Sequence, residues 1–173
     1  MRTIVLVRHG RSAHVHTGWV NVAEFRRWRE AYEAAGIVDD ERPPMMTDGG
    51  VVVASTAPRA VQSARLLRDE VIVSPLLREL DLEPPHIPRV RLPMIGWALL
   101  IGLRARATPA EKERATDAAE WLSQLAQTHG SVVAVTHAAV RAEIARALVS
   151  IRWRRDGPHR SRRHWSAWTL SRD

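Results

Sequence analysis

Short runs of apolar residues without polar alternation recur along the chain and predict its strands. Four of them, rich in Val or Ile, cover residues 4–7, 51–54, 71–73 and 131–135. Runs of this kind are typical of central strands that are covered on both faces. A fifth segment, residues 165–170, alternates between apolar and polar positions, and we expect it to be a last strand at an edge of the sheet.

Between these strands, the apolar residues follow helical spacing. Phe25, Trp28 and Tyr32 lie on one face of a predicted helix. Pro58 is suited to the first turn of a second helix, and Thr108 begins the capping pattern of a long one. The predicted helices cover residues 23–35, 58–69, 95–103, 109–128 and 139–149.

The alternation of strands and helices predicts an α/β fold. It implies three α/β/α layers around a mostly parallel central sheet. The 173 residues correspond to a single domain, residues 1–173, at roughly 100–200 residues per domain. Residues 39–50 are rich in Asp, Pro and Gly and are expected to form a loop. In such sheets, ligands bind beyond the carboxyl ends of the strands. We therefore expect the functional residues of this protein to follow the strand ends.

Three of the predicted strands end in residues suited to binding an anion. The first leads to Arg8, His9 and Gly10, the second to Arg59, and the fourth to His137. Arginine forks match the oxygens of a phosphoryl group, and a glycine lets the backbone turn and approach a ligand closely. A neutral imidazole among fixed cations is a candidate nucleophile toward phosphorus. These side chains together predict a phosphoryl-transfer site.

The amino-acid composition excludes some kinds of functional site and favours others. The chain has no cysteine, which excludes disulfides, thiolate zinc sites and cysteine nucleophiles. The formal net charge is +7, and all but one of the 26 basic side chains are arginines, Lys112 being the exception. This bias fits recognition of phosphate or nucleic acid, and it also fits an arginine-rich solvated surface. The two arginines and two histidines at strand ends favour a phosphoryl-transfer enzyme.

These residues resemble the signature of the histidine phosphatase superfamily, the phosphoglycerate mutase-like group. Its members have Arg-His-Gly at the end of the first strand, a Ser-rich turn leading to Arg-Ala-x-Gln-x-Ala, and a late strand ending in Thr-His. The corresponding residues here are Arg8-His9-Gly10, residues 55–64 (Ser-Thr-Ala-Pro-Arg-Ala-Val-Gln-Ser-Ala) and Thr136-His137. The resemblance extends from position 3 to about 149.

The resemblance implies a phosphatase mechanism. His9 would attack phosphorus in line and become a phosphohistidine. Arg8, Arg59 and His137 would hold the phosphoryl oxygens and stabilise the transferring group. A carboxylic acid would protonate the leaving oxygen and then activate the water that hydrolyses the intermediate. No metal and no organic cofactor is implied.

The acid is expected in the segment after the third strand. Glu79, in a Leu-Arg-Glu sequence, is the best match for the family's Leu-x-Glu, and Asp81 and Glu83 are the alternatives. Residues 76–107 contain several prolines and a short apolar helix, and we expect this segment to form a cap that faces the substrate.

The chain departs from the family's pattern in the segments that face the substrate. Val15 stands where the family has Asn, and Ala138 follows the second histidine where the family has Gly. The Gly-x-Trp-Glu-Gly often found after the acid is replaced by a Pro-rich stretch. Gly10, Ser12 and His14 are further candidates for the pocket. The resemblance therefore implies a reaction without naming its substrate.

The leading hypothesis is a phosphatase that acts on a small phosphorylated metabolite through His9. One alternative is a phosphohistidine-protein phosphatase, which the short chain favours. Another is a non-catalytic member of the fold that binds anions or nucleic acid through the basic residues 151–165. We favour a solvated turn before an edge strand for that segment, so no nucleic-acid partner is expected.

No membrane partner is expected either. The longest apolar stretch, residues 92–103, is much shorter than the ~20 residues that cross a bilayer. The apolar run near the first residue is too short for the core of a signal peptide. We therefore expect a cytoplasmic protein, and the sequence does not determine its oligomeric state.

Overall fold

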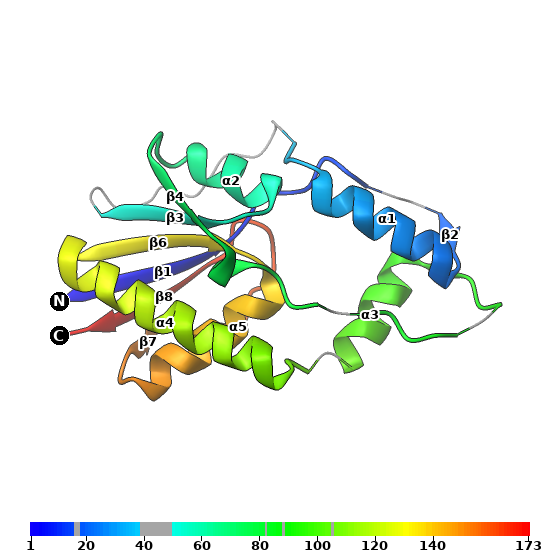
Figure 1. Ribbon diagram of the computed structural model, residues 1–173. Helices are drawn as coiled ribbons and strands as arrows, with labels where there is room; N and C mark the ends of the chain where they lie inside the picture. Colours follow the sequence, from blue (N-terminus) through cyan, green and yellow to red (C-terminus); the bar gives the residue numbers. More distant parts are fainter. Residues whose placement is uncertain (16–17, 39–49, 82, 88, 105) are drawn as a thin grey trace.

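A six-stranded sheet forms the centre of the protein (Figure 1). The computed structural model describes residues 1–15, 18–38, 50–81, 83–87, 89–104 and 106–173. In spatial order the strands are β4 (Val71–Ser74), β3 (Val51–Ser55), β6 (Ser131–Thr136), β1 (Arg2–Arg8), β8 (Ala167–Arg172) and β7 (Arg154–Asp156). The first four run parallel, β8 is antiparallel to β1, and β7 is antiparallel to β8. The mostly parallel sheet predicted from the sequence is confirmed.

Helices cover both faces of the sheet, which gives the three expected layers (Figure 1). Successive side chains of a strand point to opposite faces, and the buried residues of β1 divide accordingly. Val5 and Val7 pack in the cluster that includes α2 (Pro58–Arg65). Ile4 and Leu6 pack in the larger cluster with α4 (Pro109–His129) and α5 (Ala138–Ser150). Burial on both sides explains why the strand sequences show no alternation.

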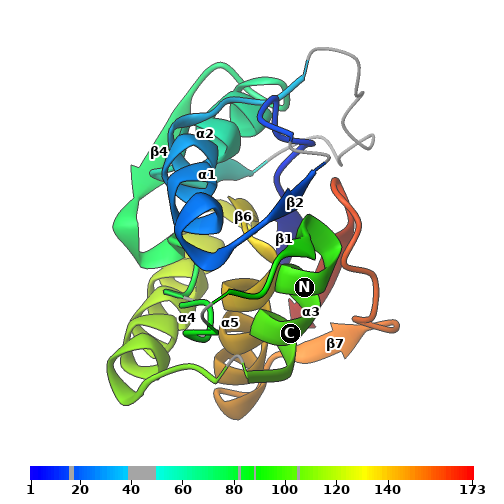
Figure 2. The same cartoon turned by 90° about the vertical axis from the view of Figure 1, so that its right-hand side faces the viewer.

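Two further helices, α1 (Val22–Ala34) and α3 (Met94–Arg104), lie beyond the end of the sheet where the parallel strands finish (Figures 1 and 2). They are joined by a small ribbon of β2 (Trp19–Val20) and β5 (Leu92–Pro93). A third buried cluster of Val20, Phe25 and Trp97 holds this part together. The Trp97 indole donates a hydrogen bond to the Val20 carbonyl (2.9 Å). No helix in the described ranges is long and apolar enough to span a bilayer.

Two sequence predictions about elements were wrong. The last strand, β8, is not at an edge, because Arg154–Asp156 forms β7 and pairs along its outer side. All three residues of β7 are exposed and polar, so no apolar pattern in the sequence predicts this strand. The helix expected over residues 58–69 ends at Arg65. The loop expected over residues 39–50 lies, apart from Gly50, outside the described residues.

Candidate active site

His9 is held at the end of β1 with one ring nitrogen engaged. Its backbone N–H donates to the Thr136 carbonyl (3.0 Å), and ring Nδ1 lies 2.7 Å from the Gly10 carbonyl oxygen. A carbonyl oxygen can only accept, so Nδ1 carries the proton and Nε2 keeps its lone pair. Burial lowers the pKa of His9 well below its usual value, and the His137, Arg59 and Arg8 side chains lower it further. His9 is therefore a neutral imidazole, and its Nε2 is the candidate nucleophilic atom.

His137 lies beside His9, at the N-terminus of α5. Their ring centroids are 5.0 Å apart in an edge-to-face arrangement. Ring Nε2 of His137 lies 2.8 Å from the Ser55 hydroxyl at the end of β3. Burial lowers the pKa of His137 to about 3, with the charges of Arg59 and Arg8 as further causes. The parallel pairing of β1 and β3 with β6 brings these side chains to one edge of the sheet.

Arg59, in the first turn of α2, connects the two histidines. Its Nε donates to Nε2 of His9 (3.3 Å), and its Nη2 lies 3.4 Å from Nδ1 of His137. The side chain is only 1% exposed, and its guanidinium lies over the Tyr32 ring at 4.4 Å. Nη2 also donates to both carboxylate oxygens of Glu33, at 3.1 and 3.2 Å. A carboxylate of this chain thus occupies donors of Arg59 that suit a phosphoryl oxygen.

The Glu79 carboxylate lies at the N-terminus of α5. Its Oε1 accepts hydrogen bonds from the backbone N–H groups of Val140 (2.8 Å) and Leu80 (3.1 Å), and its Oε2 accepts one from Ala139 (3.3 Å). Burial raises the pKa of Glu79 above its usual value, although these N–H groups and the charge of Arg8 pull it down. A raised pKa suits a group that must hold a proton and release it to a leaving oxygen.

The segment that carries Glu79 is fixed from two sides. The Thr136 hydroxyl donates to the Leu77 carbonyl (2.7 Å), and Arg114 of α4 donates to the Arg78 carbonyl (2.8 Å). The other two candidate acids are held by arginines of α1: Asp81, which also lines the cavity, pairs with Arg29, and Glu83 pairs with both Arg29 and Arg26. Both side chains are exposed and form ion pairs with arginines of α1, whereas Glu79 is partly buried and bonded to the N-terminus of α5. Glu79 is therefore the best-placed candidate for the acid.

Arg8 binds the C-terminal basic segment. Its guanidinium donates to the Arg162 carbonyl, and its backbone pairs with Trp165 and Ser166. From the same segment, His164 approaches His9: its Nδ1 lies 3.1 Å from the His9 carbonyl, and the two rings are 5.4 Å apart. Arg8 therefore acts on the histidines through its charge in this structure, and its contact with a phosphoryl group remains a prediction.

Gly10, Ser12 and His14 surround the site without lining its cavity. A Cβ at Gly10 would lie 3.0 Å from the Trp165 indole, so the glycine makes room for that ring. The buried Ser12 hydroxyl accepts from the His14 backbone N–H (3.2 Å), and the His14 ring stacks on Trp28 at 5.8 Å. The roles of these three residues in a pocket remain predictions.

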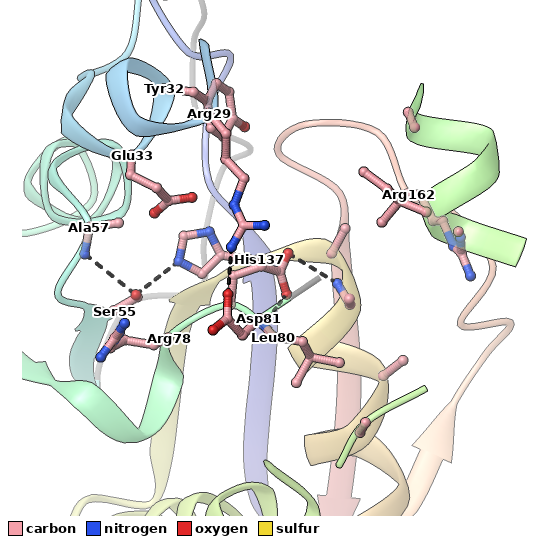
Figure 3. A pocket seen from close by; sticks show the side chains of 18 of the residues that line it. Arg29, Tyr32, Glu33, Ser55, Ala57, Arg78, Leu80, Asp81, His137 and Arg162 are labelled. Atoms are coloured by element: carbon pink, nitrogen blue, oxygen red, sulfur yellow. Dashed lines mark hydrogen bonds and ion pairs between the residues drawn. The ribbon is translucent and has the colours of Figure 1, made fainter. Parts of the chain in front are cut away.

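A cavity of about 930 Å³ opens onto this cluster between α1, α3 and α5 (Figure 3). His137, Ser55, Glu79 and Glu33 contribute to its lining. His9 and Arg59 are almost wholly buried and are not lining residues, but both lie against His137. In the described part of the chain, no group of three or more acidic or histidine side chains is arranged to hold a metal ion. The arrangement is suited to binding a dianion at its floor and transferring a proton beside it.

Sequence reasoning missed three residues of the site. Ser55 was visible within the Ser-rich motif, at a strand end, and could have been selected as a partner of a histidine. Glu33 and His164 gave no such signal, because they reach the site from α1 and from the C-terminal segment only through the tertiary structure.

Solved structures share the arrangement of this chain, whereas a scan of protein-family models and a search of curated proteins found no match. An ecdysone phosphate phosphatase from Bombyx mori, in complex with tungstate, aligns over 100% of this chain and 93% of its own, with a TM-score of 0.54 and 14% identity. A mycobacterial glucosyl-3-phosphoglycerate phosphatase with inorganic phosphate aligns over 87% and 80%, with a TM-score of 0.51 and 18% identity.

A phosphoserine phosphatase mutant from Entamoeba histolytica, in complex with phosphoserine, aligns over 87% of this chain and 81% of its own, with a TM-score of 0.51 and 11% identity. The chain has a phosphoglycerate mutase-like fold. In this phosphoglycerate mutase-like protein, His9 and His137 follow parallel strands, which is where open α/β sheets bind ligands.

Proposed function

We propose that the protein is a histidine phosphatase that hydrolyses phosphomonoesters of small metabolites through a phosphohistidine on His9. The observation that carries the proposal is the meeting of a neutral His9 with Arg59 and His137, next to a cavity that is lined by His137 and a partly buried Glu79. The shared fold supports it, because the three proteins compared above are described as phosphatases. A cytoplasmic location and a small phosphorylated substrate belong to the same proposal.

In the first step, Nε2 of His9 attacks phosphorus and the bond to the leaving oxygen breaks. Arg59 and His137 stabilise the charge on the equatorial oxygens, and Glu79 gives its proton to the leaving oxygen. In the second step, the Glu79 carboxylate takes a proton from water, whose oxygen attacks phosphorus. The bond between nitrogen and phosphorus breaks, and phosphate leaves.

Among the three acids considered from the sequence, the position of Glu79 favours the enzyme over its non-catalytic alternative. A protein that only binds anions needs no proton donor, whereas the partly buried Glu79 lines the same cavity as His137 and has a raised pKa. The phosphohistidine-protein phosphatase is kept as the alternative substrate class. It predicts hydrolysis of a phosphohistidine peptide in preference to any phosphate ester.

The deciding experiment measures hydrolysis of p-nitrophenyl phosphate by the wild type and by His9→Ala, with His129→Ala on the exposed end of α4 as the matched control. We expect His9→Ala to lower kcat by about a thousandfold or more and His129→Ala to leave it unchanged. Quenched wild-type enzyme should carry phosphate on His9, in an acid-labile and alkali-stable linkage. Equal turnover by the wild type and His9→Ala would contradict the proposal.

A further inference from the structure

We infer that the alcohol released at this site is apolar, so that the substrate is a phosphomonoester of an aliphatic or aromatic alcohol rather than of a sugar or an amino acid. This inference rests on the proposed phosphatase function and adds the class of leaving group. The evidence for it is the apolar character of the residues that line much of the cavity.

The cavity is much larger than a phosphoryl group needs. Its volume of about 930 Å³ lies at the upper end of the roughly 300–1,000 Å³ usual for small-molecule sites. His137 and Ser55 lie at the end of the cavity nearest the sheet (Figure 3), and residues of α1 and α3 line other parts of it. That space is available to the leaving alcohol.

The wall formed by α3 is apolar throughout. Met94, Ile95, Ala98, Ile101 and Gly102 line the cavity, and the helix has no polar side chain from Met94 to Leu103. Trp28 and Tyr32 of α1 lie on another side of the cavity. Hydroxyl groups buried against such walls would lose water without gaining hydrogen bonds, at a substantial cost in free energy. A hydrocarbon chain or ring would gain affinity there.

Several charged residues of the lining are engaged with one another. Arg29 pairs with Asp81, and Arg146 pairs with Glu143 one turn along α5. Arg78 and Arg162 also line the cavity and add positive charge for a phosphate. The charges of the cavity thus suit the anionic end of the substrate, while α3 suits its apolar end.

The apolar surface continues to the outside of the molecule. Ile95 lines the cavity and is 68% exposed, and Leu99 and Leu103 follow it at one-turn intervals, 61% and 82% exposed. One helix therefore carries an uninterrupted apolar path from the cavity to the solvent-facing surface. A substrate with an apolar body longer than the cavity can follow this path.

The first experiment measures kcat/KM for butyl, hexyl, octyl and decyl phosphate and for glucose 6-phosphate and phosphoserine. The burial of each added methylene should lower KM about threefold to fourfold until the cavity is filled. We expect octyl phosphate to exceed glucose 6-phosphate in kcat/KM by at least a hundredfold. Equal or better hydrolysis of the sugar and amino-acid phosphates, with no gain along the alkyl series, would overturn the inference.

The second experiment fills the cavity from α3. Gly102 lines the cavity and a Cβ there meets no atom within 4 Å, so Gly102→Phe is chosen to add a ring at this wall. It should abolish the gain in kcat/KM between butyl and octyl phosphate. Leu66→Phe is the control, since Leu66 is 52% exposed at the end of α2 and lies outside both the lining and α3. Ala98→Asn adds a polar side chain to the same wall and should reduce the increase in kcat/KM from butyl to octyl phosphate.

A binding measurement tests the apolar site independently of the proposed phosphatase activity. Alkyl phosphonates cannot be hydrolysed, so their dissociation constants can be measured by calorimetry whether or not the protein turns over. Tightening from butyl to octyl phosphonate, lost in Gly102→Phe, supports the apolar site even if His9→Ala does not affect hydrolysis. Constant affinity along the series contradicts it even in an active phosphatase.

Discussion

At the scale of single residues, Glu79 and Glu33 are two carboxylates with opposite relations to the phosphoryl site. Glu79 is partly buried, accepts hydrogen bonds from backbone N–H groups, and has a raised pKa. Glu33 is half exposed and forms an ion pair with the guanidinium of Arg59. In the proposed reaction Glu79 supplies a proton, whereas Glu33 competes with the substrate phosphate for Arg59.

Replacing Glu79 by Gln should remove the acid without changing its shape. Because an alkoxide leaves only when protonated, whereas nitrophenolate leaves readily, the loss should depend on the leaving group. We expect about a hundredfold fall in kcat for alkyl phosphates and under about tenfold for p-nitrophenyl phosphate. The pH profile provides the second readout: a raised pKa keeps Glu79 protonated above its usual range, and activity falls as pH rises through it. That alkaline limb should disappear in Glu79→Gln, and its persistence would assign the acid elsewhere.

Glu33→Gln should strengthen the binding of phosphate. The pair with Arg59 is half exposed, so its contribution is about 1 kcal/mol after allowance for solvent. Its removal should lower the inhibition constant of inorganic phosphate about fivefold. Glu30→Gln on the same helix is the control for a change in net charge alone. An unchanged inhibition constant in Glu33→Gln would mean that the carboxylate does not compete for the site.

At the scale of elements, the site depends on how β6 is joined to the segment after β4. Thr136, at the end of β6, donates its hydroxyl to the Leu77 carbonyl, and Leu77 is two residues before Glu79. Both Thr136 and Leu77 are fully buried, so no water replaces this bond. The strand that delivers His137 thereby also positions the segment of the acid.

Thr136→Val keeps the shape of the side chain and removes its donor. The Leu77 carbonyl then lacks this partner, and we expect the free energy of unfolding to fall by about 1–3 kcal/mol in urea titrations. Thr128→Val is the matched control, because that hydroxyl is exposed at the end of α4 and bonds only within its own helix. Its effect should stay within about 0.5 kcal/mol. Similar small effects of both variants would show that the Thr136 bond contributes little.

At the scale of the whole molecule, buried neutral histidines make stability depend on pH. The folded protein binds protons at His137 only near pH 3, and at His9 well below 6.5, whereas the unfolded chain binds them near 6.5. Their contribution is therefore complete above pH 6.5 and is lost as the pH falls toward 3. The raised pKa of Glu79 acts in the opposite direction, because the folded state then binds its proton first.

Between pH 6.5 and 5, we expect the free energy of unfolding to decrease by about 1–2 kcal/mol. Over this range, the loss of stability from protonating the two histidines in the unfolded chain is larger than the gain from protonating Glu79 in the folded protein. Urea titrations of the wild type and His137→Asn across this range measure the effect. The slope of stability against pH should be smaller in His137→Asn, and an unchanged slope would exclude His137 as a cause.

Patterns along the sequence predict the layers of the fold and the residues at the strand ends. Uninterrupted apolar runs such as residues 131–135 require burial on both faces, and the chain direction then places Arg8, His9 and His137 at one edge. These inferences are local, because each follows from the neighbours of a residue along the chain. The same reasoning left three acids open, although only Glu79 turns out to reach the N-terminus of α5.

The surroundings of the histidines depend on contacts between elements that are distant in the sequence. The exposed polar strand β7 gains its hydrogen bonds from β8, and Glu33 meets Arg59 across 26 positions of sequence. The apolar cavity exists because α1 and α3 pack beyond the sheet around Phe25 and Trp97. Contacts of this kind depend on distances between elements, which hydrophobic spacing along one chain segment does not encode.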